Sequence, residues 1–110
     1  MPKRIQRRRS KGWRKPRGCI YVGRPTIYGN PFGKRWPAKE RVRLFRLYLR
    51  GRWGALEKEG VGMFAIPLLQ VARKELLAAL PALRGHDLCC WCRPDHACHA
   101  DVLLEAANAD

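Results

Sequence analysis

The N-terminal third of the chain lacks acidic residues. Residues 1–39 contain 13 lysines and arginines but no aspartate or glutamate, whereas the rest of the chain holds 10 basic and 9 acidic residues. The net charge of +14 is therefore concentrated in this region, and the remaining chain is almost neutral. This asymmetry favours a polyanionic partner for the basic region, either a nucleotide or a nucleic acid.

The chain also lacks long apolar runs, low-complexity tracts and internal repeats. A helix that crosses a bilayer needs about 20 apolar residues, and no apolar signal-peptide core follows the basic N-terminus. We therefore expect no membrane association and a cytoplasmic location. A chain of 110 residues predicts one domain with a modest core. The sequence makes no prediction of the oligomeric state.

The well-spaced cysteine pairs of a disulfide framework are missing as well. The chain has five cysteines, an odd number, and four of them lie between Cys89 and Cys98. Cys89, Cys90 and Cys92 are too close together on an extended strand to pair with one another. We expect reduced thiols in a reducing compartment.

Residues 1–18 are predicted to form a basic N-terminal arm, with an edge strand over 4–9 and a loop over 10–18. This segment contains nine basic residues and Trp13. One interpretation is a solvated, disordered tail. The other is a contact surface for nucleic acid, since cations neutralise phosphates and tryptophan stacks on bases. The contact residues would be Arg7, Arg8, Arg9, Lys11, Trp13, Arg14, Lys15 and Arg17.

Residues 19–110 are predicted to form a single α/β domain. Apolar and β-branched runs predict strands over 19–23 and 88–92, while apolar residues at helical spacing predict helices. The helices are expected over 37–50, 66–80 and 98–109, with a short helix possible over 53–59. Their order, β(β)ααβα, predicts a short sheet packed by about three helices. The side chains expected to face inward from the 66–80 helix are Leu69, Ala72, Leu76, Leu77 and Leu80.

Residues 24–33 form a loop with two prolines and two glycines. Proline fixes its own φ and restricts the residue before it, so the loop must have a defined shape. Arg24, Thr26 and Asn30 are candidates to bind a ligand's phosphate and hydroxyl groups. The alternative is a loop held only by packing of Tyr28 and Phe32.

The segment 85–105 contains four cysteines and all three histidines. Its reactive side chains lie where a strand's C-terminal end meets a helix N-terminus, which is where open α/β folds bind ligands. In a first interpretation the helix N-terminus binds an anion, Cys98 is a nucleophile, and His99 is a general acid or base. Asp101 would orient them, and Cys92 would contact the ligand. Cys98 would then be the most reactive thiol.

In a second interpretation zinc is bound by Cys90, Cys92 and Cys98 together with either His99 or His96. The ligand types are suitable, and Cys90 and Cys92 share one strand face. The spacing is unusual, however, and adjacent residues on a helix point about 100° apart, so Cys98 and His99 fit one ion poorly. On this ground the sequence predicts no stoichiometric zinc. In a third interpretation the cysteines are packing residues, which suits Cys89 and Cys90 best.

Several short motifs stand out along the chain: Gly12–Arg14, Tyr21–Thr26, Gly29–Phe32, Arg84–Leu88, Cys90–Cys92 and Cys98–Leu104. Together they cover nearly the whole chain, apart from 61–66, which looks like an insertion. This combination resembles an uncharacterised family of small bacterial and phage proteins described as domain of unknown function 4326. The resemblance implies a bacterial or phage cytoplasmic protein in which the Tyr21–Phe32 loop and the loop before Cys98 form one site. It implies no particular activity.

Three functions are consistent with these observations. The first is an enzyme acting on a nucleotide or modified base, with Arg24, Asn30, Cys98 and His99 around one pocket. The second is a non-enzymatic nucleic-acid-binding module, with or without zinc. The third is a phage protein that inhibits a host protein. A pocket joining the Tyr21–Phe32 loop to Cys98 would favour the first.

Overall fold

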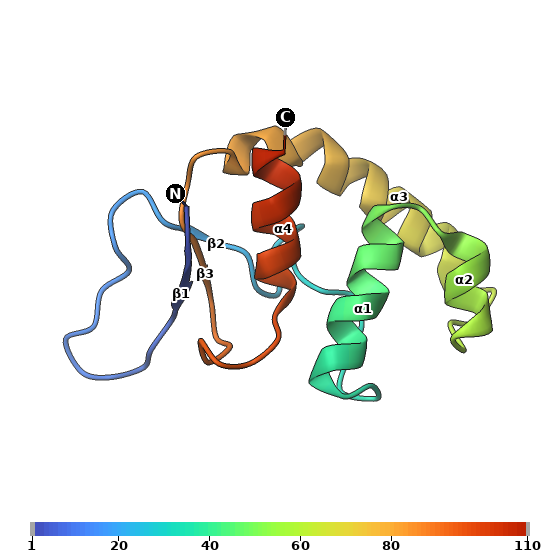
Figure 1. Ribbon diagram of the computed structural model, residues 1–110, viewed down its shortest axis with the longest axis horizontal. Helices are drawn as coiled ribbons and strands as arrows, with labels where there is room; N and C mark the ends of the chain where they lie inside the picture. Colours follow the sequence, from blue (N-terminus) through green and yellow to red (C-terminus); the bar gives the residue numbers. More distant parts are fainter. Residues whose placement is uncertain (1, 110) are drawn as a thin grey trace.

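The computed structural model describes residues 2–109 and shows a small α/β domain with a three-stranded parallel sheet (Figure 1). Met1 and Asp110, the outer bounds of the predicted arm and domain, lie outside the described residues. Among the described residues, no helix is long and apolar enough to span a membrane. The elements, in chain order, are β1 (Arg4–Gln6), β2 (Ile20–Tyr21), α1 (Ala38–Leu49), α2 (Trp53–Lys58), α3 (Ala65–Ala79), the 3-10 helix η1 (Leu80–Leu83), β3 (Leu88–Cys90) and α4 (His99–Asn108).

The sheet has the strand order β1-β3-β2, so the last strand in sequence is its central strand. Leu88 lies opposite both Arg4 of β1 and Ile20 of β2. All three residues of β3 are buried, as expected for a parallel strand covered on both faces. Because the three strands run in the same direction, the loops that follow them leave from one edge of the sheet. The ladder continues there through hydrogen bonds from Arg7 N to Cys90 O and from Val22 N to Cys89 O.

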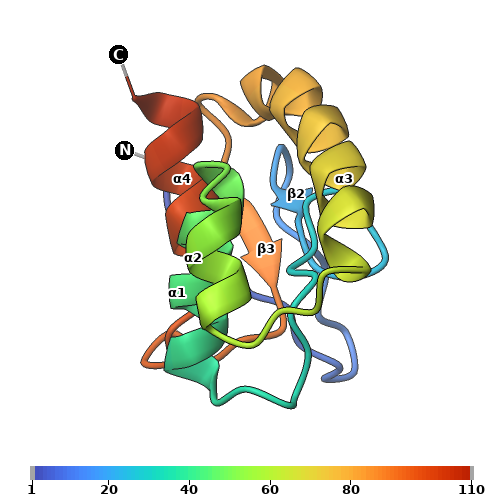
Figure 2. The same cartoon turned by 90° about the vertical axis from the view of Figure 1, so that its right-hand side faces the viewer.

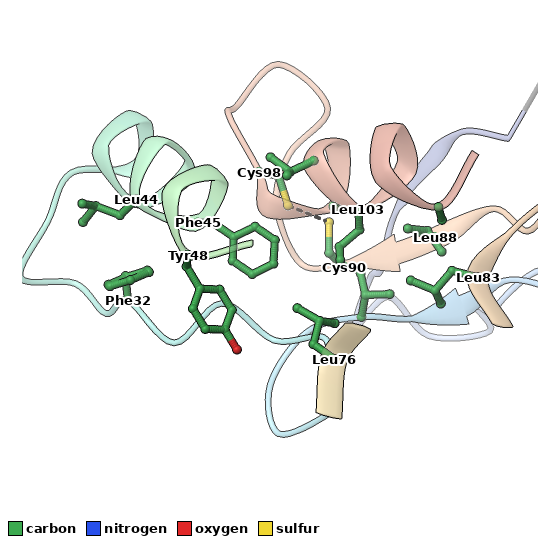
Figure 3. Close-up of a cluster of buried hydrophobic side chains, with 14 of the residues drawn as sticks. Phe32, Leu44, Phe45, Tyr48, Leu76, Leu83, Leu88, Cys90, Cys98 and Leu103 are labelled. Atoms are coloured by element: carbon green, nitrogen blue, oxygen red, sulfur yellow. Dashed lines mark hydrogen bonds between the residues drawn. The ribbon is translucent and has the colours of Figure 1, made fainter. Parts of the chain in front are cut away.

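The helices lie on both sides of the central strand. Figure 2 shows α4, α1 and α2 on one side of β3 and α3 on the other. Leu44, Phe45 and Tyr48 are the buried residues of α1. They pack with Leu76 of α3 and with residues from β3 and α4 in one core (Figure 3).

The structure confirms the predicted fold class and most of the predicted elements. Four α-helices form instead of about three, because Trp53–Lys58 forms the short helix. The basic edge strand is shorter than expected, three residues from Arg4. Two boundaries matter for the site: β3 ends at Cys90, and α4 begins at His99. The prediction that Leu77 faces inward is wrong, since its side chain is 38% exposed.

A matched pair of substitutions tests the placement of α3. Leu76 is fully buried, whereas Leu77 is exposed on the same helix. We expect Leu76→Ala to lower the free energy of unfolding by about 2–5 kcal/mol, because it leaves a cavity in the core. Leu77→Ala should change it by no more than about 0.5 kcal/mol. Urea unfolding followed by circular dichroism measures both values, and equal losses would contradict this placement.

Candidate functional site

A cavity of about 370 Å³ lies at the edge of the sheet where the strands end. We call it the cysteine cleft, because Cys90, Cys92 and Cys98 line part of its wall. Arg24 and Asn30 of the loop after β2 line another part, so the two motif loops meet in one cavity. The two loops meet because each follows a strand of the parallel sheet, and parallel strands all end at the same edge.

The sulfur atoms of Cys90, Cys92 and Cys98 all lie within 4.8 Å of one another. The Sγ atoms of Cys90 and Cys98 are 3.3 Å apart, and Figure 3 shows the two side chains pointing toward each other from β3 and the start of α4. Cys90 and Cys98 are almost fully buried, whereas Cys92 is half-buried. Cys98 is the N-cap of α4, with extended backbone angles of φ −148° and ψ 142°. This extended conformation, and not a helical one, directs its side chain toward the end of β3.

His99 is held in one orientation beside this cluster. Its Nε2 lies 2.8 Å from the carbonyl oxygen of Val22. Because a carbonyl can only accept a hydrogen bond, Nε2 carries a proton, and in the neutral ring Nδ1 then has the lone pair. Nδ1 lies 3.8 Å from the Sγ of Cys98. The ring is buried and packs edge-on against Phe45. The lone pair therefore lies next to a sulfur and is not exposed to solvent.

Arg4 of β1 supplies a buried positive charge next to the sulfurs. Its side chain is only 10% exposed, and its Nε lies 3.5 Å from Oδ1 of Asp101. Its Nη2 donates a hydrogen bond of 2.7 Å to the carbonyl of Pro94, which holds the loop between β3 and α4. Its Nη1 is buried with no hydrogen-bond partner among the described residues. Burial lowers the pKa of this guanidinium, but Cys98 and Asp101 raise it by more.

The thiols of the cluster differ in how readily they ionise. Hydrogen bonds with Cys90 and Cys92 lower the pKa of the Cys98 thiol, against the opposing effect of its burial. Hydrogen bonds with Cys92 and Cys98, together with burial, raise the pKa of Cys90. Outside the cluster, burial raises the pKa of Cys19 to about 11 and also raises that of Cys89. Cys98 is therefore the thiol that the structure favours as a thiolate.

The loop after β2 uses most of its polar groups to keep its own shape. Arg24 donates from Nε to the carbonyl of Asn30 at 3.0 Å and from Nη2 to that of Phe32 at 2.9 Å. Asn30 accepts from Phe32 N at 2.9 Å and donates to the carbonyl of Arg41 at 3.1 Å. Thr26 donates to the carbonyl of Gly23 and does not line the cleft. Of these predicted ligand-binding residues, Arg24 has the most donor capacity left for a ligand.

One residue of the cleft wall carries chemistry that the sequence did not indicate. Arg41 of α1 lines the cleft, and its buried Nε has no hydrogen-bond partner among the described residues. Arg41 is one of four arginines in the helix expected over 37–50, a pattern typical of a solvated face, so no sequence signal distinguished it. His96 also lines the cleft. Asp101, a predicted orienting residue, lies on the first turn of α4, outside the cleft lining, where burial raises its pKa despite the nearby Arg4.

The predicted nucleic-acid residues gather partly around a second cavity. We call this cavity, of about 450 Å³, the arm groove. Arg7, Arg8, Arg9, Trp13 and Lys15 line it, together with Tyr21 and Trp91. Lys11, Arg14 and Arg17 are exposed on the same arm but do not line the groove. Trp91 is not among the predicted contact residues, because a tryptophan within the apolar run 88–92 is typical of core packing.

The role of Asn30 in shaping the cleft can be tested directly. Asn30→Ala removes the partners of two part-buried backbone groups, Phe32 N and the Arg41 carbonyl. We expect a loss of about 1–3 kcal/mol in the free energy of unfolding. Lys34→Ala, an exposed change nearby, should have almost no effect. Chemical denaturation measures both, and an unchanged Asn30→Ala protein would contradict the structural role of this side chain.

Comparisons with known proteins support the resemblance seen in the motifs. No curated protein and no solved structure is similar enough to count as a match. One family pattern matches residues 5–109, which covers the cysteine cleft, most of the arm and nearly all of the domain. The chain therefore belongs to the family described as Domain of unknown function (DUF4326).

Proposed function

We propose that the protein is an enzyme that binds a nucleotide-type anion in the cysteine cleft and acts on it at a zinc ion held by Cys90, Cys92 and Cys98. The observation that carries this proposal is the meeting of three sulfurs within 4.8 Å on the wall of a cavity that arginines also line. Thiolates are preferred zinc ligands. Guanidinium groups are suited to bind phosphate.

The distances between the sulfurs suit a tetrahedral metal ion. With Zn–S bonds of about 2.3 Å, two sulfurs on one zinc lie about 3.8 Å apart. The Cys90–Cys98 pair at 3.3 Å and the upper limit of 4.8 Å for the group fall on either side of this value. The sequence-based objection concerned two ligands on adjacent helical positions. It does not apply to Cys98, because this residue is an extended N-cap.

The fourth zinc position belongs either to His99 or to a molecule in the cleft. Nδ1 of His99 lies 3.8 Å from Cys98 Sγ, close to the roughly 3.6 Å expected for nitrogen and sulfur on one zinc. Its other nitrogen donates to a backbone carbonyl, the usual way in which a ligating histidine is oriented. His99 does not belong to the group that lies within 4.8 Å, so coordination by it requires the ring to shift.

Charge balance also supports a metal with an anion beside it. Three thiolates and one Zn²⁺ carry a net charge of −1, which Arg4 would compensate with its unpartnered Nη1. Arg41, with its unpartnered Nε, remains available to a ligand, as does Arg24 on the same wall. When its fourth position is open, bound zinc supplies a water whose pKa is lowered to about 7. Arg41 and Arg24 would hold the anion next to that water.

Metal content tests the proposal most simply. We expect about one zinc per purified chain by elemental analysis, and less than about one tenth of that in Cys92→Ser, since a hydroxyl is a poor zinc ligand. Cys19→Ser is the matched control, because Cys19 is buried outside the cluster, so this variant should keep its zinc. Circular dichroism checks that both variants fold.

Two results would overturn the metal centre: zinc-free wild-type protein, or full zinc in Cys92→Ser. If the protein is zinc-free and iodoacetamide modifies Cys98 before Cys19, the cluster is a thiolate site instead. A His99→Ala variant assigns the fourth position. Loss of zinc would make His99 a ligand, whereas retained zinc would place a cleft molecule there.

Anion binding is tested by a second pair of variants. Arg41→Gln should weaken the binding of adenosine monophosphate about tenfold or more while keeping the zinc, because it removes a charge from the cleft wall. Arg50→Gln removes the same charge from an exposed position after α1 and should change binding little. Equilibrium dialysis measures both affinities. Equal affinities in the two variants would remove the cleft as the anion site.

A further inference from the structure

We propose that the arm groove binds single-stranded nucleic acid and that this strand continues into the cysteine cleft. The substrate would then be a nucleotide within a strand and not a free nucleotide. The substrate assignment rests on the proposed function of the cleft, whereas strand binding in the groove does not depend on it.

The groove combines cations with aromatic rings in a stacked arrangement. The guanidinium carbon of Arg7 lies 4.7 Å from the ring centre of Tyr21 and 4.9 Å from that of Trp91. Arg9 lies 4.8 Å from the Trp91 ring. Stacking holds each guanidinium plane while leaving its N–H edge free for a phosphate. The groove thus has cations held in fixed orientation.

No acidic side chain neutralises these cations. Within the described residues, Arg7, Arg8, Arg9 and Lys15 form no ion pair with a carboxylate. By contrast, Arg43 and Arg46 of α1 are paired with glutamates. Unpaired cations on one wall create the positive potential that attracts a polyanion.

The aromatic side chains favour a single strand over a duplex. Trp91 is 40% exposed, and Trp13 is only half-buried and makes no ring contact within the described part of the chain. Bases inside a duplex are stacked on each other, whereas bases of a single strand can stack on such rings. A site for duplex phosphates alone would need only the cations.

The groove and the cleft share two residues. Tyr21 and Trp91 line both cavities. In sequence, Trp91 lies directly between Cys90 and Cys92, two members of the sulfur cluster. A strand stacked on these two shared residues would therefore continue from the groove into the cleft.

Fluorescence anisotropy with a labelled 12-nucleotide oligo-dT and a duplex of equal length tests strand binding. We expect the single strand to bind at least tenfold more tightly at low salt, with an affinity that falls as salt is raised. Trp91→Ala should weaken this binding about tenfold or more while keeping the zinc. Phe64→Ala is the control, because Phe64 is an aromatic residue exposed at 88% outside the groove. Equal affinity for the duplex, or unchanged binding by Trp91→Ala, would overturn the proposal. So would tighter binding to vesicles of anionic phospholipid than to oligo-dT.

Photo-crosslinking distinguishes this proposal from that of the metal centre. Oligo-dT carrying 4-thiothymidine should crosslink to the peptide that contains residues 91–98 as well as to the arm. Crosslinks confined to residues 7–15 would show that the strand does not enter the cleft. Strand binding by zinc-free protein would support the groove while removing the metal centre, so the two failures can be told apart.

Discussion

The parallel pairing of β1 and β2 with β3 is the contact on which the rest of the site depends. Only the central strand is fully buried, and each neighbour is held to it by two or three residues. Because all three strands end at the same edge, the basic arm, the Arg24 loop and the cysteine loop start next to one another. Two cavities that share Tyr21 and Trp91 result from this arrangement.

The same pairing explains why a buried arginine lies beside the sulfurs. Arg4 lies opposite Leu88 in the sheet, and its side chain reaches the carbonyl of Pro94 and the carboxylate of Asp101. An isolated charge at this depth would be costly. It is compensated in part by these contacts and, in the proposed state, by thiolates on a metal. The N-terminal arm is thus part of the site, because it supplies Arg4.

The sequence predicted the elements well because their signals are local. Apolar spacing in 66–80 indicated a helix, which forms as α3. The helix expected over 37–50 forms as α1 and is followed by Gly51, whose φ is +69°. The family resemblance implied that the two motif loops form one site, and Arg24 and Cys98 line one cavity.

The parts that were missed depend on contacts between residues distant in sequence. Arg4 and Pro94 are 90 residues apart, and no pattern in the chain links them. The extended conformation of Cys98 reversed the argument against zinc, because a one-residue shift in the helix start changes where a side chain points. Leu77 was placed inward by spacing alone, but α3 buries a narrower face than its composition suggests.

The central claim is that Cys90, Cys92 and Cys98 hold one zinc ion between them. X-ray absorption at the zinc edge of the purified protein measures the number and type of atoms bound to the metal. The proposal predicts three sulfur atoms at about 2.3 Å and one nitrogen or oxygen at about 2.0–2.1 Å. Protein without zinc, or zinc surrounded only by nitrogen and oxygen, would contradict it.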